Sequence, residues 1–260
     1  MDFTMELGDG SKAARKRMAP EDRREAILNA AQALFMERGW EAVTIADVLE
    51  AAGISKGGFY HHFTAKEDLL TGIVVRMTQE VIIVAETARR EASGDALARL
   101  NAFMAGSVSW KAENTAEMRF FTNVLAKPGN DILYRRIFDA TAVAVVPVLE
   151  DLVAEGIEDG TFDVTDTRVT AEVIVGLSHG RRQVLEDAVV RASSGDLDEA
   201  ARLLDDRMRA EGAICDRLLC LPQGSVRLSS PQDHRRMLIG LSTPDRANEQ
   251  ADAMCRHKDQ

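Results

Sequence analysis

The segment from Thr44 to Phe63 constrains the fold of this chain more than any other part of the sequence. Thr44 and Ser55 are residue types that cap the N-termini of helices, and Gly53 between them permits the backbone conformation of a tight turn. Apolar residues recur at helical spacing on both sides of the glycine, and Phe59 and Phe63 lie four positions apart on one face. We therefore predict two short helices joined by a turn, the arrangement of a helix-turn-helix.

Two longer helices flank this motif. The first begins at Pro20, a residue suited to the first turn of a helix, and ends at Gly39. After the motif, Thr64 and Glu67 have the spacing of a capping box, which predicts the start of a long helix that reaches about Arg90.

The rest of the chain is also predicted to be helical, because no stretch alternates apolar and polar residues with the period of a strand. We therefore expect an all-α protein of about nine helices. Residues 222–260 are rich in Pro, Ser, Gln, Asp and Arg without periodicity, which predicts a disordered tail. The predicted helices beyond residue 93 lie near 95–111, 114–127, 130–158, 166–192 and 196–220.

The distribution of charge decides whether the motif is compatible with DNA. The chain carries 32 Lys and Arg against 42 Asp and Glu, and its net charge of −10 alone argues against a general nucleic-acid binder. Residues 11–66, however, contain nine basic and seven acidic residues, whereas residues 67–260 contain 23 basic and 32 acidic ones. The acidic excess therefore lies away from the helix-turn-helix.

The face of the second short helix opposite its phenylalanines is small and polar. Two glycines allow the backbone to approach nucleic acid closely, and His61, on the same face as Gly57, is long enough to reach a base edge or a phosphate. Tyr60 and Lys66 suit phosphate contacts, and Thr44 begins a helix whose first amides form an anion site. The predicted DNA-contacting set is Thr44, Ser55, Lys56, Gly57, Gly58, Tyr60, His61 and Lys66.

Several stretches between Ala30 and Leu70 occur together in a characteristic order. They are Gly39-Trp40, Val43-Thr-Ile, Ala52-Gly-Ile-Ser-Lys-Gly-Gly-Phe-Tyr-His-His-Phe and Lys66-Glu-Asp-Leu. This run resembles the N-terminal domain of TetR-family transcriptional repressors. The resemblance implies an all-helical homodimer with a three-helix DNA-binding head. It also implies a larger C-terminal domain that binds a small-molecule inducer and dimerises through its last two helices.

These expectations divide the chain into four parts. Residues 1–19 form a flexible basic arm, 20–66 the DNA-binding domain, 67–221 the ligand-binding and dimerisation domain, and 222–260 the tail. Aromatic and polar residues of the third part are candidates for the wall of a pocket for a largely apolar inducer, although such residues at helical spacing also form plain cores. The candidates are Met77, Phe103, Ser107, Trp110, Phe121, Tyr134, Phe138 and His179.

The predicted helix over 166–192 has two apolar stripes, so it needs cover on two sides. One cover is its own core, and we expect the other to be a second copy of the chain. Gly176 and Gly180 permit a close crossing with the helix over 196–220, which completes the predicted dimer interface. The alternative is a monomer with a well-buried central helix.

Several function classes lack support in the sequence. We find no catalytic motif and no spacing typical of a metal site, so we expect neither an enzyme nor a bound cofactor or metal. The alternatives that remain are a helical small-molecule-binding protein and an activator on the same fold. The N-terminus is acidic and no apolar run is long enough for a membrane span, which predicts a cytoplasmic protein. For Cys215 and Cys220, burial is favoured over redox sensing.

Overall fold

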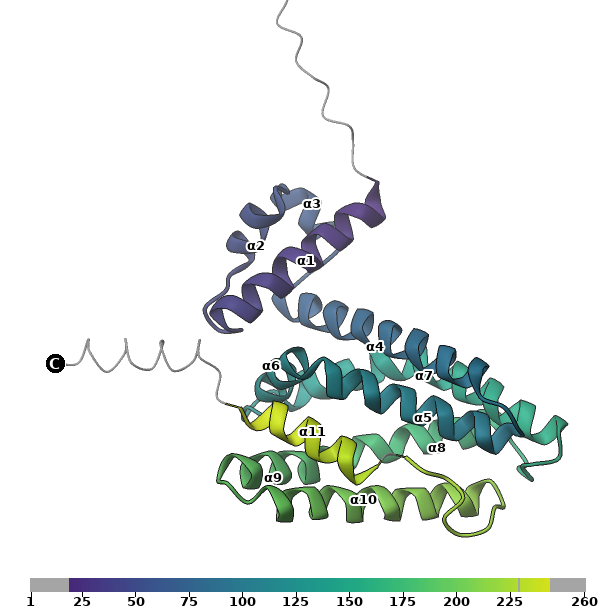
Figure 1. The fold of residues 1–260 in the computed structure, drawn as a ribbon. Coiled ribbons are helices and arrows are strands. Elements are labelled where there is room, and N and C mark those ends of the chain that lie inside the picture. Colours follow the sequence, from purple (N-terminus) through teal and green to yellow (C-terminus); the bar gives the residue numbers. More distant parts are fainter. Residues whose placement is uncertain (1–18, 229, 244–260) are drawn as a thin grey trace, which may run out of the picture.

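The computed structural model describes residues 19–228 and 230–243, and every regular element within these ranges is a helix. The all-α prediction is confirmed, with eleven helices in the described part rather than about nine (Figure 1). None of these helices combines the length and the apolar character needed to cross a bilayer. The helices are α1 (Pro20–Arg38), α2 (Ile45–Ala52), α3 (Lys56–Tyr60), α4 (Lys66–Glu91), α5 (Ala96–Glu113), α6 (Thr115–Leu125), α7 (Asp131–Glu158), α8 (Thr167–His179), α9 (Arg182–Ser193), α10 (Leu197–Leu218) and α11 (Pro231–Ser242).

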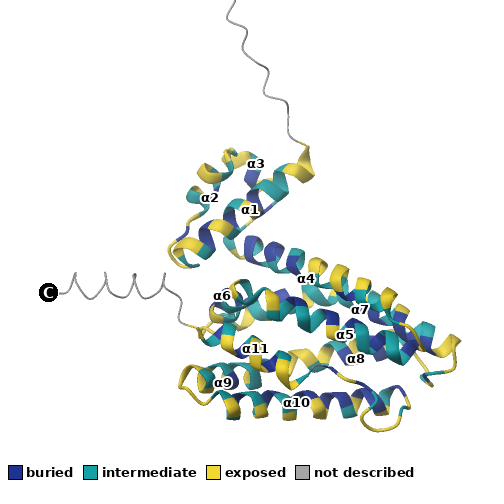
Figure 2. Cartoon of the chain, viewed as in Figure 1, coloured by how far each residue is buried: buried dark blue, intermediate teal, exposed yellow. Residues whose placement is uncertain are grey.

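Helices α1–α3 form a small head at one end of α4, and α4–α11 form a larger body (Figure 1). The head is held by side chains from each of its helices, including Phe35 of α1, Val48 of α2 and Phe59 of α3, all of which are buried. Leu70 and Ile73 of α4 complete the same cluster. Burial is concentrated on the faces that the helices turn toward one another (Figure 2).

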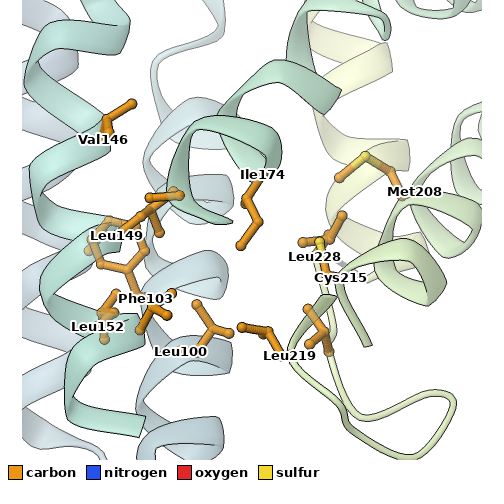
Figure 3. Packing of buried hydrophobic residues seen from close by; sticks show 14 of the residues in the cluster. Leu100, Phe103, Val146, Leu149, Leu152, Ile174, Met208, Cys215, Leu219 and Leu228 are labelled. Carbon is orange, nitrogen blue, oxygen red and sulfur yellow. The ribbon is translucent and has the colours of Figure 1, made fainter. Parts of the chain in front are cut away.

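The body has its own core. Helices α5, α7, α8 and α10 each contribute apolar side chains that project toward a common centre (Figure 3). Leu152 of α7, Leu204 of α10 and Leu100 of α5 are among its most buried members. Because these side chains are buried from water between the helices, the body is stabilised mainly by the hydrophobic effect.

The predicted single helix over 166–192 is interrupted. The structure ends α8 at His179 and begins α9 at Arg182, with Gly180 and Arg181 between them. The side chain of Arg181 turns inward to the buried carboxylate of Glu211 on α10. This long-range ion pair coincides with the break, and the apolar periodicity on either side gave no sign of it.

The predicted disorder of the tail was wrong for its first half. Ser230 caps α11 by accepting a hydrogen bond from the backbone N–H of Asp233, and Pro231 occupies the first turn. His234, Leu238 and Leu241 follow at helical spacing and are buried. The helix packs against α5, α6, α9 and α10, so it belongs to the body. Residues 1–18, which hold most of the predicted basic arm, and residues 244–260 lie outside the described part of the chain.

A pair of variants in α11 tests whether this helix contributes to stability. Leu238 is 0% exposed and its neighbour Ile239 is 49% exposed. We expect Leu238→Ala to lower the free energy of unfolding by about 2–5 kcal/mol, because the variant leaves a cavity in a packed interface. Ile239→Ala should change it by less than about 1 kcal/mol. Urea unfolding followed by circular dichroism gives both values, and equal effects would mean that α11 is not docked.

Candidate nucleic-acid interface and internal cavities

The caps predicted around the turn are present. The backbone N–H of Thr44 donates to Asp47 Oδ2 at 2.7 Å, and the N–H of Asp47 donates back to Thr44 Oγ1 at 3.3 Å, which closes a capping box. Gly53 ends α2 with a left-handed φ of 64°, and Ser55 Oγ accepts from the N–H of Gly58 at 3.2 Å. These local hydrogen bonds fix the angle at which α3 leaves α2.

Most of the predicted DNA-contacting residues share an open surface. The side of the head formed by α2 and α3 lies away from the body (Figure 1). Tyr60 is 47% exposed, which is unusual for a large aromatic residue and leaves its hydroxyl group accessible. The Lys56 ammonium lies 6.0 Å from the centroid of the Tyr60 ring. The exposed members of the set are Thr44, Ser55, Lys56, Gly57, Tyr60 and His61.

The two glycines of α3 have different surroundings. A Cβ atom at Gly57 would meet no other atom within 4 Å, so this position faces open space. A Cβ atom at Gly58 would lie 3.0 Å from Ile54 Cγ2, inside the head. Gly57 therefore leaves room for another molecule, whereas Gly58 allows α3 to pack against the turn.

Lys66 lies at the base of the head rather than beside α3. Its ammonium donates a hydrogen bond to the backbone carbonyl of Trp40 and lies 4.4 Å from the centroid of the Trp40 ring. Burial lowers the pKa of Lys66 below the ordinary lysine value. Lys66 thus ties the end of α1 to the start of α4, and its contact with phosphate stays a prediction.

The start of α4 differs from the prediction of a capping box between Thr64 and Glu67. Asp68 is the capping residue, because its Oδ2 accepts from the N–H of Thr64 at 2.6 Å and from the N–H of Ala65 at 3.0 Å. Its other oxygen pairs with Arg136 of α7. Burial alone would raise the pKa of Asp68, but the hydrogen bonds from Thr64 and Arg136 outweigh it and lower the pKa to about 2.

The head and the body share apolar and polar contacts. The ring of Phe35 in α1 stacks on that of Phe120 in α6 with centroids 6.2 Å apart. Arg76 of α4 donates to Glu25 Oε2 at 2.9 Å and to Asn29 Oδ1 at 2.7 Å, both on α1. The apolar cluster of the head therefore continues into the body without a gap.

Two cavities adjoin inside the body. The first has a volume of about 250 Å³ and is bordered by Phe103, Ser107 and Phe138. The second has a volume of about 280 Å³ and is bordered by four further predicted residues. Of the predicted pocket residues only His179 lines neither cavity; it is exposed, with its ring 4.8 Å from that of Phe138. The four residues at the second cavity are Met77, Trp110, Phe121 and Tyr134.

The cavities also contain charged groups that the sequence analysis did not include. Lys111 and Arg181 border both cavities, and Glu211 borders the first. Glu211 is 1% exposed and accepts hydrogen bonds from Arg181 Nε at 3.0 Å and from Arg207 Nε at 2.6 Å. Cys215 lines the first cavity as a free thiol, and burial together with the charge of Glu211 raises its pKa to about 11. A thiol with this pKa stays protonated at neutral pH, which favours a structural role. Cys220 is exposed, so the prediction of burial was wrong for that residue.

One face of α8 is apolar and uncovered in the isolated chain. Val169 and Val173 are exposed, and a Cβ atom at Gly176 would meet no atom within 4 Å. The predicted close crossing of this glycine with α10 is therefore wrong within one chain. At Gly180 a Cβ atom would lie 3.0 Å from Arg207 Nη2, so that position does face α10.

The cap at Asp68 generates a test with a matched neighbour. Asp68→Ala should lower the free energy of unfolding by about 1–2 kcal/mol at pH 7, because two backbone donors lose their acceptor. Glu67→Ala, at the residue that the spacing favoured, should change it by less than about 0.5 kcal/mol. Equal losses in the two variants would contradict the assignment.

The same cap has a pH signature. Because the pKa of Asp68 is lowered to about 2 in the folded chain, its stabilising effect is complete above the ordinary pKa of 3.8 and disappears as the pH falls through 2. The difference in stability between wild type and Asp68→Ala should therefore shrink between pH 7 and pH 3, as measured by urea unfolding. A constant difference would show that the ionised carboxylate is not responsible.

Comparison with known proteins identifies relatives of a part of the chain. Residues 27–73 match the family profile described as "Bacterial regulatory proteins, tetR family". The chain is 46% identical over 52 residues to the HTH-type transcriptional repressor KstR2 of Rhodococcus jostii, a match that covers 20% of this chain and 26% of that protein. It is 29% identical over 94 residues to the HTH-type transcriptional regulator AlkX of Mycobacterium tuberculosis, covering 36% of this chain and 43% of that protein. The chain thus spans about a quarter to under a half of these curated relatives.

Solved structures resemble the whole fold. The structure of RolR in complex with resorcinol superimposes with a TM-score of 0.51 at 20% identity, covering 84% of this chain and 94% of that one. A TetR-family regulator from Syntrophomonas wolfei gives a TM-score of 0.53 at 18% identity, covering 74% of this chain and 96% of that one. At this level of identity the similarity establishes the fold alone.

Proposed function

We propose that this chain, whose residues 27–73 match the tetR family profile of bacterial regulatory proteins, is a repressor of that family that binds its operator as a homodimer and is released by a small molecule. The observation that carries the proposal is the exposed surface of α3, held by its caps on the outer side of the head. The cavities of the body supply the place for the small molecule.

In the proposed complex, α3 enters the major groove of DNA. Gly57 permits close approach, while Lys56, Tyr60 and His61 supply a cation, a hydroxyl group and an imidazole for phosphates or base edges. Asp47 lies nearby as an acid, but its carboxylate is occupied by Thr44 and lies 4.0 Å from Arg38 Nη1. The surface of α3 can therefore accept the phosphate backbone of DNA.

The exposed face of α8 supports the homodimer. Val169, Val173 and Gly176 lie at spacings of four and three residues, so they share one face of the helix. Ile214 of α10 is a further exposed apolar residue. A second copy of the chain would cover this face, and binding to a near-palindromic operator requires that the dimer set its two α3 helices about one DNA turn apart.

Helix α6 links the cavities to the head. Phe121 borders the second cavity, and the adjacent residue Phe120 stacks on Phe35 of the head. A ligand that displaces α6 would therefore change the angle of the head and with it the spacing of the two α3 helices. A coupling free energy of about 1–3 kcal/mol is enough to weaken DNA binding by about 5- to 150-fold.

DNA binding is tested with two single variants, one that removes a positive charge from α3 and a control that removes a positive charge far from α3. Lys56→Ala should weaken binding to fragments of the promoter region of its own gene, because one phosphate contact is lost. The slope of log affinity against log salt should fall by about one. Arg90→Ala, near the other end of α4, should leave both values unchanged. Fluorescence anisotropy across a salt series measures them; absence of salt-dependent binding by wild type would refute the proposed function.

The dimer is tested with two glutamates at exposed valines. Val173→Glu places a charge on the proposed α8 interface, so we expect a monomer in sedimentation velocity where wild type is a dimer. Val143→Glu, at the 75% exposed Val143 of α7, is the control and should remain dimeric. A dimer that tolerates Val173→Glu, or a monomeric wild type, would place the interface elsewhere or remove it.

A further inference from the structure

Lys111 occupies an unusual position at the junction of the two cavities. It lies on α5 four residues after Ser107 and eight after Phe103, which puts all three on one face of the helix. The cavities share Lys111, Arg181 and Ser178 in their walls, so they adjoin at this point. Within residues 19–228 and 230–243, no carboxylate lies within ion-pair distance of the Lys111 ammonium and no hydrogen-bond acceptor is assigned to it.

The charges around Lys111 leave its positive charge uncompensated. Arg181 and Arg207 share the single carboxylate of Glu211, so this ion-pair network is itself positive by one charge. Arg182 borders the second cavity and pairs with Glu186 and Asp131, so this second group is negative by one charge. The two groups cancel each other and leave the charge of Lys111 over. The Cys215 thiol and the Tyr134 phenol both have raised pKa values, because burial disfavours their anions, and add no negative charge.

A largely buried ammonium without a counter-charge is unfavourable. Burial lowers the pKa of Lys111 to about 8, and the nearby charge of Arg181 adds to the effect. With this pKa most Lys111 side chains are still charged at pH 7. The free protein therefore keeps a charged Lys111 beside cavities whose walls also carry many apolar side chains, and this environment favours the binding of an anion.

We propose that the two adjoining cavities form the site for an organic anion with an apolar body, and that its acidic group pairs with Lys111. This inference rests on the proposed function, since it names the class of the releasing ligand. The apolar body lies among Phe103, Phe138 and Phe121, and the hydroxyl group of Ser107 is available beside the acidic group. The expectation of a largely apolar inducer is thereby narrowed to an amphipathic acid.

A pair of fluorescent probes with one skeleton tests the proposal. 8-Anilinonaphthalene-1-sulfonate carries a sulfonate, whereas N-phenyl-1-naphthylamine is its uncharged counterpart, and both fluoresce in apolar sites. Wild type should bind the sulfonate more tightly than the amine. Lys111→Met should weaken sulfonate binding by about tenfold or more, because the counter-charge is lost, and should change amine binding by less than about twofold.

Three controls separate the charge from the fold. Lys111→Arg keeps the positive charge and should retain the preference for the sulfonate. Lys127→Met removes an exposed lysine of similar shape, whose partner is Glu41, and should behave as wild type. The midpoint temperature of thermal unfolding of Lys111→Met should be no lower than that of wild type, because the variant removes an uncompensated buried charge.

The outcomes distinguish this inference from the proposed function. Unchanged sulfonate affinity in Lys111→Met, or equal losses for both probes, would overturn the inference even if the protein binds DNA. If Lys111→Met loses affinity for the sulfonate but not for the amine, and Lys111→Arg and Lys127→Met keep both affinities, the inference is supported even if no operator binding is found. In the latter case the protein would bind anions without being a DNA-binding repressor.

Discussion

The continuity of apolar packing from the head into the body is the constraint on which the rest of the structure depends. Phe35 contacts Phe120 across the boundary, and Leu70 and Ile73 of α4 are buried in the same cluster. The head therefore cannot rotate independently of the body, because such a rotation would expose this cluster to water. Its orientation follows that of α4 and α6, and those two helices also border the cavities.

The sequence predicted the parts of the fold that local chemistry determines. Thr44, Gly53 and Ser55 act within three or four residues, so their roles as caps and turn residues could be predicted without a partner element. The prediction was wrong where distant groups decide. Asp68 rather than Glu67 caps α4, and its other carboxylate oxygen pairs with Arg136 of α7. The break after α8 coincides with the ion pair between Arg181 and Glu211. The tail was misjudged because its polar composition hid a helical period at His234, Leu238 and Leu241.

The cavity residues were predictable to a similar degree. Aromatic residues with a polar group, such as Trp110 and Tyr134, indicated where the helices leave space, and the structure places both at the second cavity. Lys111 was missed, although its spacing from Phe103 and Ser107 assigns it to the same helix face. Nothing in the spacing alone shows whether a lysine finds a carboxylate on another helix, and that question decides its chemistry. The positive charge at the junction of the two cavities could therefore not be predicted from the sequence and is recognised only in the structure.

Helix α11 bears on how far α6 is free to move. A Cβ atom at Gly240 would lie 2.4 Å from Thr115 Cβ, so the two helices approach with no room for a methyl group. Arg119 of α6 also donates at 3.1 Å to the carbonyl of Gly240 and to that of Thr243. Since α11 packs on α9 and α10 as well, any displacement of α6 either carries this helix along or breaks those bonds. In the proposed release from DNA, α11 would therefore add to the free-energy cost of moving α6, although no residue of α11 lines either cavity.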